Sequence, residues 1–189
     1  REQFLFYEIR VLARLLNDGL SEEEAVQQII DENLFQFPTE RMLKSIAGTC
    51  LKRIHALDNV ALAAGLAIEP FAVAKQINLY AIMRQNRIVW DFMVDVVGEK
   101  YRIQDLAYEK KDLNIFFMTL SEQVEAVASW SDATVRKIKQ VLTKFLVECE
   151  YLDNPRSDHL NPVYLCPELE SGIRANGDTE AFAAFNFFE

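Results

Sequence analysis

The sequence predicts a mainly α-helical protein, a multi-helix bundle that contains helix-turn-helix or winged-helix modules and a small C-terminal β-hairpin wing. Apolar residues recur at helical spacing over most of the 189 residues, and several of these stretches follow a helix-capping residue. Near the C-terminus, "YLDNPRSDHLNPVYLCPEL" contains three prolines and two Asn-Pro pairs, a composition typical of short strands joined by a turn. We expect an N-terminal helix-turn-helix-like module at 1–58, a central helical core at 59–120 and a winged-helix-like module at 121–189.

The first module begins with a predicted buried helix, "FLFYEIRVLARLL", which ends at an Asn-Asp-Gly stop. Ser21 is placed to cap a second helix, whose first turn carries three glutamates at the positive end of the helix dipole. After the break at Phe37-Pro38, Thr39 is placed to cap a third, amphipathic helix that runs to about Leu57. From Thr39 to His55 this helix has four Lys or Arg and one acid. Its outer face is formed by Arg41, Lys44, Ser45, Gly48, Lys52 and His55.

The middle of the chain is predicted to form several helices rich in large apolar residues. "FAVAKQINLYAIMRQNRIVWDFMVDVVGEKY" is expected to supply the central core, and "DLNIFFMTLSEQVEAVASW" leads into the next helix. The longest apolar run spans only 60–68, far short of the roughly 20 residues that a membrane helix needs. We therefore expect a cytoplasmic protein with no membrane partner.

A helix that begins at Ser131 or Asp132 and runs to about Glu150 concentrates positive charge in an acidic chain. Its apolar residues follow helical spacing and must face a core. Between Trp130 and Phe145 there are four Lys or Arg and one acid, although the net charge of the whole chain is −9. The cations lie in the first turns, where the helix dipole is also positive, so an anionic partner would relieve their repulsion.

The order helix, short turn, capped helix, strand–turn–strand is that of a winged helix, whose second helix enters the DNA major groove. Arg136 and Lys137 are then placed to contact phosphate or guanine, Gln140 to pair with adenine, and Arg156 to reach the backbone from the wing. Double-stranded DNA is the predicted partner. The expected DNA-binding residues are Ser131, Ala133, Thr134, Arg136, Lys137, Lys139, Gln140, Lys144 and Arg156, with Arg41, Lys44, Ser45 and Lys52 on the earlier cationic helix. Solvated charge on an exposed helix face, or a helix-turn-helix unit that only packs, remains the alternative interpretation.

The sequence offers little support for an enzyme. Only two histidines are present and no two cysteines are close enough for a C-x-x-C pair, so no metal site and no cofactor are expected. No glycine-rich phosphate loop occurs among six glycines, and no small-molecule substrate is expected. Glu109-Lys110-Lys111 has the E-x-K spacing of some nucleases, but it stands in helical or loop sequence and one such match is expected by chance. We therefore predict a non-enzymatic protein.

Several phrases together carry a family resemblance. They are "FLFYEIRVLARLLNDGLSEEE", "ENLFQFPTERMLK", "LKRIHALD", "AKQINLYAIMR", "DLNIFF", "VASWSDATVRKIKQVLTKFLVE" and "PELESGIRANGD". With them the chain resembles, over nearly its whole length, the BrxA family of bacteriophage exclusion (BREX) defence systems of bacteria. The "SWSDATVRKIKQVLTKFL" block is the most specific part of this resemblance.

The resemblance implies an all-helical protein with winged-helix or helix-turn-helix modules that binds double-stranded DNA. It also implies a non-enzymatic role in phage defence, beside other BREX proteins as partners. Two alternatives stay open. One is a protein–protein adaptor of the defence complex, which would use an apolar surface such as the phenylalanine-rich tail "AFAAFNFFE". The other is a helical RNA-binding protein.

Overall fold

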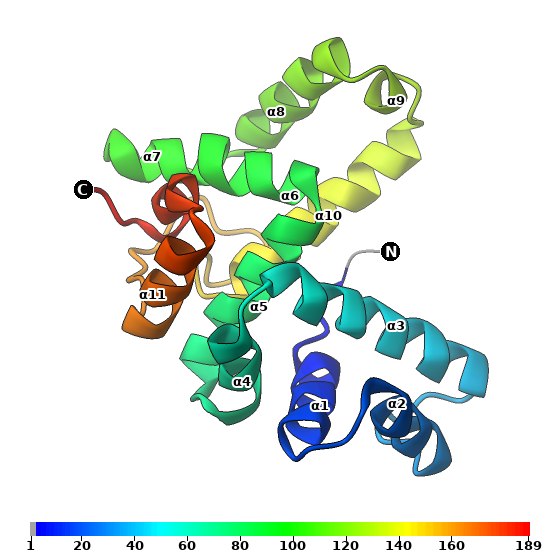
Figure 1. Ribbon diagram of the computed structural model, residues 1–189. Helices are drawn as coiled ribbons and strands as arrows, with labels where there is room; N and C mark the ends of the chain where they lie inside the picture. The colour runs from blue at the N-terminus through cyan, green and yellow to red at the C-terminus, as the bar shows by residue number, and fades with distance from the viewer. Residues whose placement is uncertain (1–2) are drawn as a thin grey trace. The chain divides into compact units, whose positions relative to one another are not determined.

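The computed structural model of the protein describes residues 3–189, and its regular elements over that range are helices (Figure 1). The chain divides into two compact units, each assembled from separate segments. The N-terminal unit contains Phe4–Arg87 and Cys166–Thr179, and the C-terminal unit contains Ile88–Leu165 and Glu180–Glu189. The predicted mainly α-helical class is confirmed, whereas the expected organisation into three modules stays a prediction.

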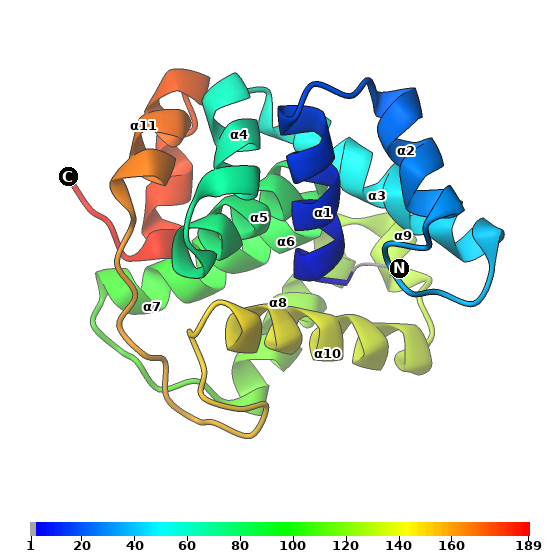
Figure 2. The ribbon, with the colours of Figure 1, turned by 90° about the horizontal axis from the view of Figure 1, so that it is seen from below.

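The N-terminal unit consists of six helices, which Figure 2 shows from below. They are α1 (Phe6–Asn17), α2 (Glu22–Asp31), α3 (Glu40–Leu57), α4 (Val60–Ile68), α5 (Phe71–Gln85) and α11 (Pro167–Asn176). Helix α5 packs against α3, α4 and α11, and it is buried on most sides from Ile77 to Met83. The predicted caps are confirmed, because the side chains of Ser21 and Thr39 accept hydrogen bonds from the backbone N–H groups of Glu24 and Met42.

One buried carbonyl joins three segments of this unit. The Phe4 carbonyl accepts hydrogen bonds from the Arg53 guanidinium on α3 (2.6 Å) and from the Asn78 amide on α5 (2.7 Å). Both side chains are fully buried. Arg53 is one of the four cations counted on the predicted cationic helix, and it belongs to the core instead. The outer face of α3 keeps the three Lys or Arg side chains predicted for it, Arg41, Lys44 and Lys52.

The C-terminal unit begins with a helical stretch that changes type along its length. Helix α6 (Arg87–Asp91) continues as the π-helix η1 (Phe92–Gly98) and then as α7 (Glu99–Arg102). Gly98 lies against Ala183, where an added Cβ would come within 2.8 Å of the alanine side chain and 3.0 Å of its backbone. Only glycine permits this approach of η1 to the final 3₁₀ helix, η2 (Thr179–Phe185).

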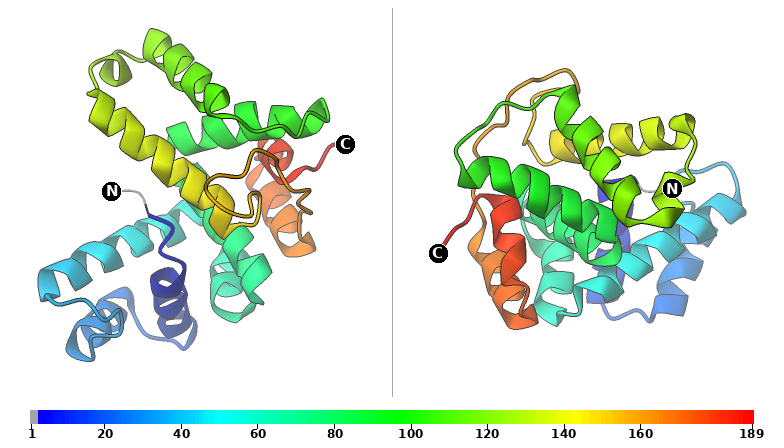
Figure 3. Two further views of the ribbon diagram at one scale, coloured as in Figure 1. Left: turned by 180° about the vertical axis from the view of Figure 1, so that it is seen from behind. Right: turned by 90° about the horizontal axis from the view of Figure 1, so that it is seen from above.

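The rest of the C-terminal unit contains α8 (Lys110–Gln123), the single turn α9 (Glu125–Ala128) and α10 (Asp132–Glu148). Helices α8 and α10 run in opposite directions and are joined through α9, as Figures 1 and 3 show. Phe116 and Phe92 pack edge to face and hold α8 against η1.

The predicted C-terminal β-hairpin wing is wrong, because no strand is formed anywhere in the described chain from residue 3 onward. The stretch 151–166 is irregular, and its one bridge joins His159 to Ala107 before α8. Pro155 and Pro162 lack the N–H groups that a hairpin ladder would use. The Asn161 side chain donates instead to the Glu150 carbonyl (3.1 Å) and to the Asp153 carboxylate (2.9 Å). The winged-helix prediction is therefore not supported.

The phenylalanine-rich tail packs within the C-terminal unit. Phe182 and Phe185 are buried in η2, and the exposed Phe188 ring lies under the Arg102 guanidinium at 4.9 Å. The two buried rings cannot serve as the exposed apolar anchor of the adaptor alternative. No helix in the part of the chain described is long and apolar enough to cross a membrane.

Candidate nucleic-acid interface

Helix α10 forms as the capping signal and the apolar spacing predict. Ser131 is its N-cap and accepts a hydrogen bond from the backbone N–H of Thr134 (3.2 Å). The buried side chains Leu142, Phe145 and Leu146 fix the inner face of the helix. The opposite face is exposed at four of the five predicted cationic and polar contact positions, and Lys139 is half-buried at its flank. These residues are Arg136, Lys137, Lys139, Gln140 and Lys144.

A groove of about 960 Å³ lies between α8, α10 and the turn at 155–158. We call it the basic groove. Of the predicted residues, it brings together Arg136, Lys139, Gln140, Lys144 and Arg156. Ser131, Ala133, Thr134 and Lys137 are exposed on α10 but lie outside its lining. Arg156 reaches the groove although it stands on an irregular turn and not on a wing.

The basic groove keeps most of its positive charge available. Its lining has five cations and three carboxylates. Among residues 3–189, Arg136, Lys144 and Arg156 make no side-chain ion pair. Lys139 is the exception to this availability, because its amine donates to Asn114 (2.6 Å) and lies 5.7 Å from the centre of the Phe117 ring. Unpaired cations in a groove are the arrangement that a polyanion requires.

Main-chain bonds from a distant segment position one wall of this groove. The backbone N–H of Tyr108 donates to the Asp158 carbonyl (2.8 Å), and that of Leu160 donates to the Leu106 carbonyl (2.7 Å). Burial raises the pKa of Tyr108 to about 12, so its hydroxyl stays neutral at physiological pH. Within the described residues this buried hydroxyl makes no hydrogen bond of standard geometry, although Thr143 lies beside it. Because this hydroxyl is buried, Tyr108 supports the groove wall by packing and offers no donor to a ligand.

The groove residues that sequence reasoning missed include Tyr108, Lys110 and Asn114. The sequence signal for these residues is the capping box at the start of α8. Glu109 is its N-cap, and Asp112 lies in the first turn, within "KKDLN". The E-x-K pattern here is part of that cap, because Lys111 pairs with Glu109 at 3.3 Å. No three His, Cys, Asp or Glu side chains gather as a metal site among residues 3–189.

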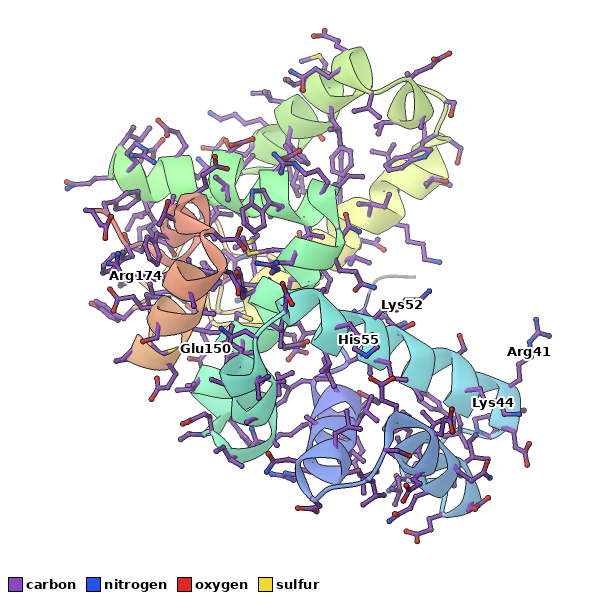
Figure 4. The ribbon with its side chains drawn as sticks, in the orientation of Figure 1. Arg41, Lys44, Lys52, His55, Glu150 and Arg174 are labelled. Atoms are coloured by element: carbon purple, nitrogen blue, oxygen red, sulfur yellow. The ribbon has the colours of Figure 1, made fainter. Side chains whose placement is uncertain are left out.

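The second predicted set lies on α3 in the other unit. Arg41, Lys44, Ser45 and Lys52 are all exposed, and Figure 4 shows Arg41 projecting from the N-terminal end of α3. None of the three cations makes an ion pair within the part of the chain that the structure describes. His55 is exposed on the same face, as expected, and pairs with Glu22 on α2. The cationic surface of α3 is therefore limited to its first three turns and Lys52.

Comparison with known proteins gives a consistent result along the sequence. The model of the BrxA family matches residues 1–177. The chain is 37% identical to the BREX protein BrxA of Bacillus cereus (strain H3081.97), over 92% of this chain and 87% of the relative. It is 30% identical to the BREX protein BrxA of Escherichia coli O9:H4 (strain HS), over 92% of this chain and 81% of that relative.

A solved structure shares the fold. The crystal structure of an uncharacterized protein from Magnetospirillum magneticum matches with a TM-score of 0.80 and 20% sequence identity. The match covers 97% of this chain and 93% of that one.

Proposed function

Because the chain belongs to the BrxA family, we propose that it is a non-enzymatic, double-stranded DNA-binding protein of a BREX phage-defence system. Two of the relatives carry the name BREX protein BrxA. These names support a role in a BREX system. The unpaired cations of the basic groove support DNA as the ligand. Other BREX proteins are the expected protein partners.

The observation that carries this proposal is the local charge of the basic groove. The whole chain has a net charge of −9, which opposes binding of DNA by its general surface. Charges separated by more than about 8–10 Å are largely screened at physiological salt, so a local cationic surface acts on its own. Arg136 and Lys144 lie two turns apart on α10 and face the same groove as Arg156. Their separation along the helix, about 12 Å at 1.5 Å per residue, lets each cation meet a different phosphate.

Phosphate contacts are expected to dominate the affinity, and sequence preference is expected to be weak. Arg136, Lys144 and Arg156 are the proposed phosphate ligands, because ionised donors make the strongest bonds to phosphate. Gln140 lies between the first two on the same face and is the side chain placed to read a base edge. Lys137 adds charge at the exposed N-terminal end of α10, where the helix dipole also favours an anion.

The test compares two triple variants that lose the same charge. Arg136→Gln/Lys144→Gln/Arg156→Gln removes the three unpaired cations proposed as phosphate ligands in the basic groove. The control, Arg102→Gln/Lys111→Gln/Arg174→Gln, removes three cations that already pair with Glu99, Glu109 and Glu170 at 3.2, 3.3 and 3.1 Å. Fluorescence anisotropy with labelled duplex DNA should detect loss of binding in the first variant alone. Equal losses in both variants would reduce the effect to net charge and contradict the proposed groove.

A salt series sharpens the same experiment. Each phosphate contact contributes about 0.9 to the slope of log K against log salt, so losing three contacts should make the slope shallower by about 2.7. An unchanged slope would place the phosphates elsewhere, and the α3 variant Arg41→Gln/Lys44→Gln/Lys52→Gln then tests the second cationic surface. Duplex DNA, single-stranded DNA and RNA are titrated in parallel. A preference for RNA would replace the DNA proposal with the RNA-binding alternative.

A further inference from the structure

The other side of α8 borders a second groove within the C-terminal unit, formed with α6, η1 and α7. We call it the acidic groove. Its lining contains five carboxylates, from Asp91, Asp95, Glu99, Asp105 and Asp112, and a single cation, Lys100. The Lys100 amine is already committed, because it donates to the Ala107 carbonyl (2.6 Å) and pairs with Asp112 (3.3 Å). Glu99 pairs with Arg102, which lies outside the lining (3.2 Å). With Lys100 and Arg102 both counted, the five carboxylates leave an excess of three negative charges.

Large apolar side chains lie among these carboxylates. Ile103 and Ile115 line the groove and are 60% and 52% exposed, while Phe116 is buried beneath them. A single exposed isoleucine is ordinary on a protein surface. Two that face one groove from different helices, bordered by acids, resemble the surface of a protein–protein contact instead.

The length of the acidic groove matches about three turns of a helix. Along α8 the lining runs from Asp112 to Gln123, which spans about 17 Å at 1.5 Å per residue, or three turns. The facing wall runs from Asp91 to Ile103 through the π-helix η1. Two helices that flank an open groove of this length can accept a third helix along it. Short π-helical stretches are also frequent at functional sites.

We propose that the acidic groove binds a lysine- or arginine-rich amphipathic helix of a partner protein, about three turns long. The apolar face of that helix covers Ile103 and Ile115, and its cations meet the carboxylates of Asp95 and Glu99. Nucleic acid is excluded by like-charge repulsion. Helix α10 of a second copy fits poorly, because its cationic outer face, at Arg136, Lys137, Gln140 and Lys144, carries no large apolar side chain.

The test uses a fluorescent synthetic helix of about 14 residues, with lysine and leucine on opposite faces, and a scrambled peptide of the same composition. The groove variant Asp95→Lys/Glu99→Lys is paired with the control Glu122→Lys/Glu125→Lys. The control makes the same charge change on exposed residues of α8 and α9 outside the groove. Ile115→Ser tests the apolar contribution separately. Circular dichroism and thermal melting check that each variant folds.

The wild-type chain should bind the amphipathic helix at least about tenfold more tightly than the scrambled peptide. The groove variant should lose about tenfold in affinity, and the control should stay within about twofold of wild type. Duplex DNA binding should persist in the groove variant, so failure here is separable from failure of the DNA proposal. Equal affinity for both peptides, or equal losses in groove variant and control, overturns the proposal. If the wild-type chain dimerises and the groove variant does not, the groove binds a second copy of this chain. That outcome also overturns the proposal.

Discussion

The basic and acidic grooves share α8 as a wall, yet they differ in the sign of their charge and in the exposed side chains that accompany it. Around the basic groove, Arg136, Lys144 and Arg156 are unpaired, and no exposed large apolar side chain accompanies them. In the acidic groove, Lys100 is bonded internally and two exposed isoleucines stand among carboxylates. A polyanion needs little beyond free cations, whereas a protein surface needs apolar area that can be removed from water. The net charge of the chain, −9, describes neither groove.

The largest expected effect removes both grooves together. Phe145 is buried on the inner face of α10. Phe145→Ala should therefore destabilise the chain by about 3–5 kcal/mol through lost burial and a cavity. Denaturant unfolding measures the loss, and both DNA and peptide binding should weaken at a temperature where the variant begins to unfold. Phe145→Leu should cost much less, about 1 kcal/mol. A fully stable Phe145→Ala variant would contradict the packing of α10 described above.

Single charge reversals test the contrast between the grooves directly. Lys144→Glu should weaken duplex DNA binding about tenfold, or about 1.4 kcal/mol, because it places a carboxylate among the proposed phosphate ligands. Glu99→Lys, on the other side of α8, should change DNA affinity less than about threefold. Anisotropy titrations at one salt concentration compare the two. Similar changes of opposite sign would mean that DNA responds to total charge and not to a groove.

The pH dependence of stability probes the wall of the basic groove. The pKa of Tyr108 is raised by burial to about 12, above its ordinary value of 10, so the folded state holds this proton more tightly. The stabilisation from Tyr108 is therefore complete below about pH 10 and is lost as the pH rises towards 12. Unfolding free energies measured across that range should fall for the wild type and fall less steeply for Tyr108→Phe. Parallel curves would show that Tyr108 is not protected in the folded state. Tyr80, also raised to about 12, contributes the same trend in both proteins.

The smallest expected effect on DNA affinity is that of replacing Lys139, whose amine already has a partner within the protein. Lys139 already bonds to Asn114 and lies over the Phe117 ring, so Lys139→Met should lower stability by about 0.5–1 kcal/mol. Its effect on DNA affinity should be only about twofold, smaller than that of Lys144→Met. Chemical unfolding and anisotropy together measure both quantities. A larger DNA defect for Lys139→Met than for Lys144→Met would reverse the assignment of the free cations.

Helical elements and faces were predictable because their signals are local. The caps at Ser21, Thr39 and Ser131, and the apolar spacing of α10, each depend on residues within a few turns of one another. The cationic side of α10 follows from the same spacing. These features required no knowledge of the rest of the chain.

The errors came from partners far along the sequence. Arg53 counts toward the local charge of α3 until its buried acceptor, the carbonyl of Phe4, is known. His55 lies exposed as predicted, but its partner Glu22 on α2 has no local signal. The prolines and asparagines after α10 favour a hairpin within that segment. The segment bridges instead to Ala107, before α8. The same long-range pairing brings Tyr108 to the basic groove, and the acidic groove depends on two helices meeting.

Because each unit draws on a late segment, synthesis and folding cannot proceed unit by unit. The N-terminal unit lacks α11 until residues Cys166–Thr179 have been made, and the C-terminal unit waits for Glu180–Glu189. Domains commonly fold as they leave the ribosome, the first before the second. Here neither unit is complete before its own late segment has emerged. A nonsense codon before Cys166 would therefore remove a segment from both units at once.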